Sequence, residues 1–119
     1  MHDFKKMKVW QKARELTKKV YLMSEKYPYK EVFGLTSLIR RTAISVISNI
    51  AEGSGRNTDG EFSNFLGIAY GSSCELEAQV IISSDLGYIT ISEAELIHEE
   101  INEVQKMLHT LIQKFKKNK

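Results

Sequence analysis

Residues 35–56, LTSLIRRTAISVISNIAEGSGR, place two arginines and several small polar residues within an otherwise apolar helical pattern. Arg41, Ser45, Ser48 and Glu52 follow one another at steps of four, three and four, so they lie along one line of an α-helix. On one side of this polar seam, the residues with the spacing of a buried stripe are Leu35, Leu38, Ile39, Ala43, Val46 and Ile50. Beside the seam lie Ile44, Ile47 and Ala51. The segment therefore predicts a helix with two largely apolar surfaces, which contacts neighbours on more than one side.

Helical periodicity extends over most of the chain. We expect four helices, over about 8–27, 30–54, 59–86 and 92–116, because short runs of turn-forming residues separate the periodic segments. The fourth segment has a heptad pattern formed by Ile97, Ile101, Val104, Leu108, Leu111 and Phe115. No segment of any length predicts a strand. Residues 1–119 are thus expected to form one all-α domain, an up-down-up-down antiparallel four-helix bundle.

Helix ends have recognisable signals. Pro28 ends the first helix, and the Gly53-Ser-Gly55 pair predicts a left-handed end for the second. Thr58 or Asp59 caps the third helix, and Ser92 caps the fourth with Glu95 at capping-box spacing. Within the third helix, small residues are expected to allow close approach of a neighbouring helix, and they are Gly67, Gly71, Ser72, Ser73 and Ala78. The single cysteine, Cys74, is expected in the core.

The lone cysteine and the absence of a long apolar run favour a reducing cytoplasm over a membrane or secreted location. Net charge is only +2, yet residues 1–41 contain 11 Lys and Arg against 4 Asp and Glu, and residues 42–104 contain 1 against 11. Residues 105–119 are again basic. If the first and last helices are neighbours, they form a basic surface of Lys5, Lys6, Lys8, Lys12, Lys18, Lys19, Lys114, Lys116 and Lys117. The alternative is that these lysines only solvate the helices.

Several short motifs, distributed along the whole chain, resemble one known family. They are DFKKMKVWQKA from Asp3, GLTSLIRR from Gly34, SNIAEG from Ser48, Gly55-Arg56, the pairs Glu61-Phe62, Phe65-Leu66 and Gly71-Ser72, ELE from Glu75 and LGY from Leu86. The chain resembles the small four-helix bundle proteins named for reading frames in intervening sequences of bacterial 23S rRNA genes.

The resemblance implies a ring-shaped homo-oligomer, expected to be a pentamer. A related branch, the accessory proteins of diversity-generating retroelements, forms a basic barrel that binds a reverse transcriptase and nucleic acid. Two positions depart from the family pattern: Ile47 replaces a common proline, and Ser54 replaces a frequent aromatic residue. Loss of the proline predicts a straighter second helix.

The candidate site residues form an extended polar set, either structural or binding: Arg40, Arg41, Ser45, Ser48, Asn49, Glu52, Arg56, Glu75 and Glu77. Adjacent arginines on a helix point about 100° apart. One of them is expected to pair with Glu75 or Glu77 across the bundle; a guanidinium that binds phosphate is the alternative.

Asn49, Glu52 and Arg56 are expected to converge at the end of the second helix, as a helix-end polar network or, alternatively, with Glu52 as a general base. No nucleophile or phosphate-binding loop accompanies them. His98 and His109 are too far apart for one metal ion, and His2 is expected in a mobile terminus.

We therefore expect no enzyme activity, cofactor or metal. The predicted function is a binding or scaffolding module in a homo-oligomer, with RNA, DNA or a nucleic-acid-processing protein as partner. A structural or selfish-element product without nucleic-acid affinity is the alternative.

Overall fold

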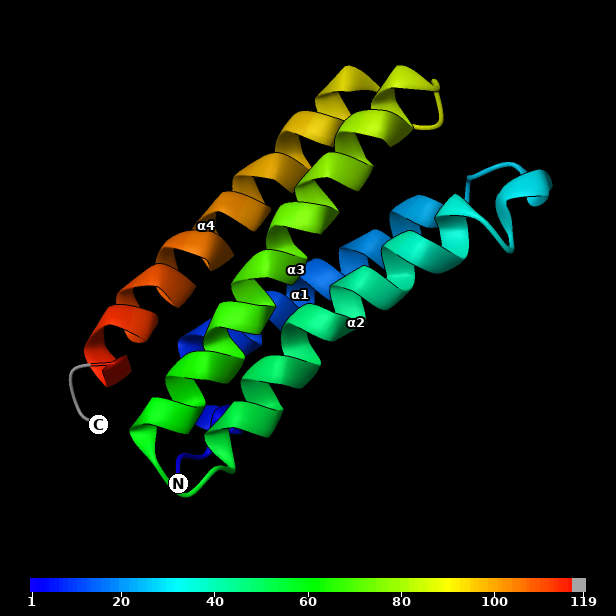
Figure 1. Ribbon diagram of the computed structural model, residues 1–119. Coiled ribbons are helices and arrows are strands. Elements are labelled where there is room, and N and C mark those ends of the chain that lie inside the picture. Colours follow the sequence, from blue (N-terminus) through cyan, green and yellow to red (C-terminus); the bar gives the residue numbers. More distant parts are fainter. Residues whose placement is uncertain (117–119) are drawn as a thin grey trace.

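The computed structural model describes residues 1–116 and contains four α-helices: α1 (Lys8–Ser24), α2 (Leu35–Ser54), α3 (Asp59–Asp85) and α4 (Ile91–Lys116). Short 3-10 helices at Phe4–Lys6 and Tyr29–Glu31 precede α1 and α2. Consecutive helices run in opposite directions and form an elongated four-helix bundle of 45 × 24 × 20 Å (Figure 1). The N-terminus, the α2–α3 turn and the end of α4 lie at one end of this bundle. None of the described residues forms a strand.

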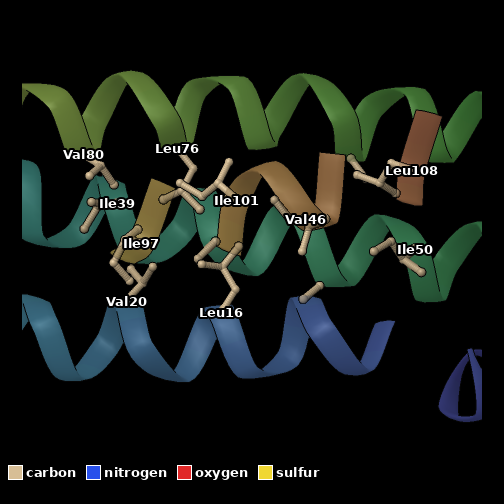
Figure 2. Close-up of a cluster of buried hydrophobic side chains, with 14 of the residues drawn as sticks. Leu16, Val20, Ile39, Val46, Ile50, Leu76, Val80, Ile97, Ile101 and Leu108 are labelled. Atoms are coloured by element: carbon tan, nitrogen blue, oxygen red, sulfur yellow. The ribbon is translucent and has the colours of Figure 1, made fainter. Parts of the chain in front are cut away.

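The core lies between the four helices and consists of aliphatic side chains from all of them (Figure 2). Its fully buried members include Leu16, Val20, Ile39, Val46, Ile50, Leu76, Val80, Ile101 and Leu108. Each such side chain stabilises the fold by about 1.5–3 kcal/mol relative to an exposed one. The heptad pattern of α4 is confirmed as its core face, with Leu111 only half-buried.

Two helices are shorter than predicted around Pro28. The first ends at Ser24 rather than at residue 27, because residues 25–27 continue as a turn with hydrogen bonds to carbonyls only three residues back. The second begins at Leu35 rather than at residue 30. Its first N–H, that of Leu35, donates to Glu31 Oε1 at 3.1 Å, so the Glu31 side chain supplies an acceptor that the helix itself lacks.

The helix caps decide between Thr58 and Asp59 at the start of α3, and they correct the predicted cap of α4. Thr58 caps α3, since its hydroxyl accepts the Glu61 N–H at 3.1 Å. Thr90 rather than Ser92 caps α4: Thr90 Oγ1 accepts the Glu93 N–H at 3.1 Å, and Glu93 Oε1 accepts the Thr90 N–H at 3.0 Å. The capping box is thus present, two residues earlier than predicted, because α4 begins at Ile91.

The predicted left-handed helix end is also at a different glycine. Gly55 has φ −87°, whereas Gly87, after α3, has φ 78° and is the one residue among 1–116 with positive φ. At this end the Tyr88 N–H donates to the Ser83 carbonyl at 2.9 Å and the Gly87 N–H to that of Ser84 at 3.0 Å, the paired hydrogen bonds of a Schellman motif.

Close approach between α2 and α3 occurs at Gly53. A Cβ there would lie 2.6 Å from Phe65 Cβ and 2.8 Å from a ring carbon of Phe62. By contrast, Gly67 and Gly71 are exposed, and a Cβ on either would meet nothing within 4 Å. The close approach of a neighbouring helix predicted at these α3 glycines is therefore not formed within one chain. Ala78 is exposed as well, while Ser72 and Ser73 are buried.

A hydrogen bond joins the loop before α2 to the loop after α3. Tyr88 donates its hydroxyl proton to Glu31 Oε2 at 2.8 Å. The Leu35 N–H first, and this hydroxyl second, hold the pKa of Glu31 below its ordinary value of 4.5. The same bond to Glu31 raises the pKa of Tyr88. The start of α2 and the end of α3 are thereby fixed to each other.

Candidate functional site

The polar seam of α2 lies along the outer rim of its contact with α3. Ser45 Oγ and Ser72 Oγ are 2.8 Å apart, and the Asn49 amide donates to the Ser45 carbonyl at 2.8 Å. Ser48 is exposed. Next along the contact, the Gln79 amide donates to Thr42 Oγ1 at 3.0 Å. These bonds position α2 on α3.

The two arginines separate, as their adjacency predicts, but neither pairs with a glutamate of α3. Arg40 points towards α1, where its Nε donates to Ser24 Oγ at 2.7 Å and its Nη2 to the Tyr21 carbonyl at 3.2 Å. Its guanidinium also lies 4.9 Å from the centroid of the Tyr21 ring. Arg41 is exposed and has no ion-pair partner within residues 1–116. The predicted pairing is wrong because position 40 faces α1 and not α3.

The predicted glutamate partners have other environments. Glu75 is exposed on the outer side of α3. Glu77 is half-buried and accepts a long hydrogen bond, 3.4 Å, from the Gln105 amide of α4. Both carboxylates therefore lie outside the contact between α1 and α2 that Arg40 stabilises.

Asn49, Glu52 and Arg56 do not converge. Asn49 bonds back to Ser45, Glu52 is exposed, and the Arg56 guanidinium lies 4.5 Å from the centroid of the Phe65 ring. The structure thus provides Glu52 with no orienting arginine. The general-base arrangement considered from the sequence is not formed by these side chains.

An exposed apolar surface continues on both sides of the polar seam. On α3, Ile68, Glu75 and Ile82 recur every seven residues, and Leu86 follows one turn later. Ile68, Ile82 and Leu86 are about half exposed, at 53%, 49% and 54%. On α2, Leu38 is exposed beside Arg41, while Ile47 packs against the core. We call the surface formed by Leu38, Arg41, Ser45, Ser48, Glu52, Ile68, Glu75, Ile82 and Leu86 the α2–α3 face.

The predicted basic surface divides into two groups. Along α1, the lysines near the middle of the helix are paired: Lys12 with Glu103 at 3.0 Å, Lys18 with Glu15 at 3.6 Å and Lys19 with Glu100 at 2.6 Å. Near the chain ends, five predicted lysines have no carboxylate partner among the described residues: Lys5, Lys6, Lys8, Lys114 and Lys116. Lys117 lies outside the described residues.

Two further lysines complete this pattern. Lys26 pairs with Glu93, which lowers the pKa of Glu93 below 4.5 together with the Thr90 N–H. Lys106 of α4 has no described partner and lies near Lys8, since both line one hollow between α1 and α4. The sequence contained a signal for the pairs, because Lys12, Lys19 and Lys26 recur every seven residues, as do Glu93 and Glu100. We call Lys5, Lys6, Lys8, Lys106, Lys114 and Lys116 the basic end.

The N-terminus is held against this end of the bundle. The His2 ring lies tilted against Phe62 and Phe115, with centroids 5.1 and 4.9 Å away, and its Nε2 lies 3.0 Å from Asp59 Oδ1. The His2 N–H donates to the Ser54 carbonyl at 2.8 Å. The expected mobile position of His2 is therefore wrong. Asp3 is engaged too, as acceptor of the Lys5 N–H at 3.1 Å.

The remaining candidates for reactive chemistry lie apart. Cys74 is exposed, contrary to the expected core position, with its sulfur 3.8 Å from the Gln105 amide nitrogen. His109 is exposed, whereas His98 is half-buried and its Nδ1 has no hydrogen-bond partner among the described side chains and backbone. Within residues 1–116, no three His, Cys, Asp or Glu side chains lie close enough together to hold a metal ion. None of the described helices is both long and apolar enough to cross a membrane.

The fold and these surfaces define a small antiparallel four-helix bundle protein with an exposed apolar face and a basic end. The family model described as 23S rRNA-intervening sequence protein matches residues 5–110. The chain belongs to this family, which confirms the resemblance seen in the sequence.

A solved structure supports the same fold. The chain is similar to a protein of unknown function from the S23 ribosomal protein family of Bacteroides thetaiotaomicron VPI-5482, with 25% sequence identity and a TM-score of 0.81. The similarity covers 87% of this chain and 97% of the other. No curated protein matches the chain.

Proposed function

We propose that this protein is a non-enzymatic binding module that assembles with copies of itself and binds nucleic acid through its basic end. The observation that supports this proposal is the separation of paired from unpaired lysines. Lys12, Lys19 and Lys26 have glutamate partners on α4, whereas the lysines of the basic end have none among the described residues.

Unpaired ammonium groups at one end of a helical bundle repel one another and attract polyanions. A nucleic acid supplies phosphates at regular spacing and gains affinity from each counterion that the lysines release. Two carboxylates lie near the basic end, Asp3 at the Lys5 N–H and Asp59 against His2, and the six lysines outnumber them. Binding should consequently depend strongly on salt and weakly on sequence.

The α2–α3 face supports the assembly part of the proposal. Exposed aliphatic side chains in a continuous strip are typical of protein interfaces. Arg41 and Glu75 are both exposed on this face and have no ion-pair partner within residues 1–116, so they offer opposite charges to a second copy. A ring, such as the pentamer that the family resemblance implies, requires this face to contact a different face of the next subunit.

A binding function also fits the chemistry of the polar seam. Ser45 and Ser72 hydrogen-bond to each other, and Ser45 Oγ accepts from the Asn49 amide rather than donating to a base. Glu52 is solvated, and Arg56 stacks on Phe65. These residues hold helices and present a surface, so we propose no reaction for them. We further propose a cytoplasmic location.

Two measurements test the proposal. Mass in solution at micromolar concentration should exceed that of one chain, and a mass of 13.6 kDa would refute assembly. Fluorescence anisotropy with labelled RNA and DNA should show binding at about 50 mM salt that weakens steeply by about 200 mM. Absence of binding to either nucleic acid at low salt would favour the structural or selfish-element alternative.

A matched pair of variants identifies the binding surface. The double change Lys5→Glu and Lys6→Glu should weaken binding and reduce the salt slope by about two for duplex DNA, because two phosphate contacts are lost. The control, Lys18→Glu with Lys30→Glu, makes the same change in net charge away from the basic end. Equal losses in both variants would show that net charge alone, and not this surface, attracts the nucleic acid.

A further inference from the structure

Lysine–glutamate ion pairs form a row along the contact between α1 and α4. The row ends at a position where two lysines lie together without a glutamate. Towards the loop end, Lys26 pairs with Glu93; next come Lys19 with Glu100 at 2.6 Å and Lys12 with Glu103 at 3.0 Å. One turn further along each helix, Lys8 and Lys106 follow. The last position of the row thus has two cations where the others have a cation and an anion.

These two lysines flank an apolar hollow of about 480 Å³. Its lining includes Met7 and Val9 from the start of α1, and Met107 and Leu111 from α4. Volumes of roughly 300–1,000 Å³ with mostly apolar walls are typical of ligand sites. Because the lining contains two lysines and no carboxylate, an anion with an apolar body would satisfy both the charge and the walls.

We infer that this hollow binds one unpaired base of a single-stranded nucleic acid, with the flanking phosphates at Lys8 and Lys106. The inference rests on the proposed nucleic-acid binding and names the form of nucleic acid that is preferred. In a duplex the base faces are stacked inside, whereas a single strand can turn a base into an apolar site.

Two features favour a base over an aliphatic chain with one acidic group. Met7, just before α1, and Met107 of α4 both line the hollow, and thioether sulfurs make favourable contacts with aromatic rings. Moreover, Lys5 and Lys6 directly precede Met7 in the chain, and Lys114 and Lys116 follow Leu111 on α4. One carboxylate would neutralise a fraction of this charge, whereas a phosphate chain extends over all of it.

The test compares a labelled oligothymidylate of about twelve nucleotides with a duplex of the same length, since single-strand sites span about 4–16 nucleotides. The wild-type protein should bind the single strand more tightly than the duplex. Met107→Gln keeps the length of the side chain and all lysines but makes the wall polar. It should lower single-strand affinity by roughly fivefold or more and leave duplex affinity unchanged, because contacts with a base are lost.

Lys106→Glu tests the charge without endangering the fold. It creates a fourth ion pair with Lys8, so the thermal midpoint should not fall, while the preference for the single strand should disappear. The control with the same charge change is Lys30→Glu, on the exposed loop at the other end, which should keep the preference.

The outcomes separate this inference from the proposed function. Equal binding of single strand and duplex by the wild type, or a single-strand preference that survives both Met107→Gln and Lys106→Glu, overturns the inference and leaves binding at the basic end intact. Lack of binding to both probes overturns the proposed function as well.

Discussion

Replacement of Gly53 by alanine should destabilise the protein, although alanine is the better helix former. The new Cβ would lie 2.6 Å from Phe65 Cβ and 2.8 Å from the Phe62 ring. Ordinary contact begins near 3.4 Å, so α2 and α3 would have to separate by about 0.8 Å at this point. Phe65 Cβ is fixed to its backbone and Phe62 is buried, so neither can move aside cheaply.

The magnitude follows from two opposing terms. Overpacking costs about 1–3 kcal/mol, and the gain in helix propensity from glycine to alanine offsets at most about 1 kcal/mol. A net loss of up to about 2 kcal/mol lowers the thermal midpoint of a chain of this size by up to roughly 8 °C, since the unfolding entropy is about 2.1 cal/mol/K per residue.

Gly67→Ala is the matched control. It makes the same chemical change on α3, but its Cβ meets nothing within 4 Å, so it should stabilise by about 0.5–1 kcal/mol through propensity alone. Thermal unfolding followed by circular dichroism, at equal protein concentration, checks both variants. An equal rise in midpoint for the two would refute the close approach of α2 and α3 at Gly53.

Three further predictions concern single side chains. Arg40→Met should lower the free energy of unfolding by about 1.5–3 kcal/mol in chemical denaturation, because charged hydrogen bonds to Ser24 and Tyr21 are lost. Arg41→Met should leave stability unchanged and weaken self-association. A reversed pattern would contradict these placements. Thr90→Ala should cost about 1 kcal/mol as a lost helix cap, whereas Ser92→Ala should be nearly neutral in the same assay. Because the folded-state pKa of Glu31 lies below 4.5, the stability that Glu31 contributes is present above that pH and is lost as pH falls through the folded-state pKa. Glu31→Gln should therefore reduce the loss of stability at acidic pH in an unfolding profile against pH. An unchanged loss would exclude the contribution.

The helices and most of the core could be predicted from the sequence, because an amphipathic helix shows its buried side in its own spacing. The seam from Ile97 to Phe115 on α4 is an example. Thr58 was among the predicted caps because capping depends on residues within one turn. The predicted cap of α4 was two residues too late. Thr90-x-x-Glu93 and Ser92-x-x-Glu95 have the same spacing, so the sequence alone does not select between them, and the structure uses the first.

The sequence by itself therefore determined four helices, their apolar faces and the family. The tertiary structure decided which neighbour each polar residue meets. Arg40 binds α1, and Lys8 lies with Lys106 at an apolar hollow. Lys12 and Lys19 of α1, and Lys26 after it, meet glutamates of α4. Periodicity gives the angle of a side chain around its own helix axis, but not which helix occupies that angle or at what height. Those are set by the loops and by the joint packing of all four helices.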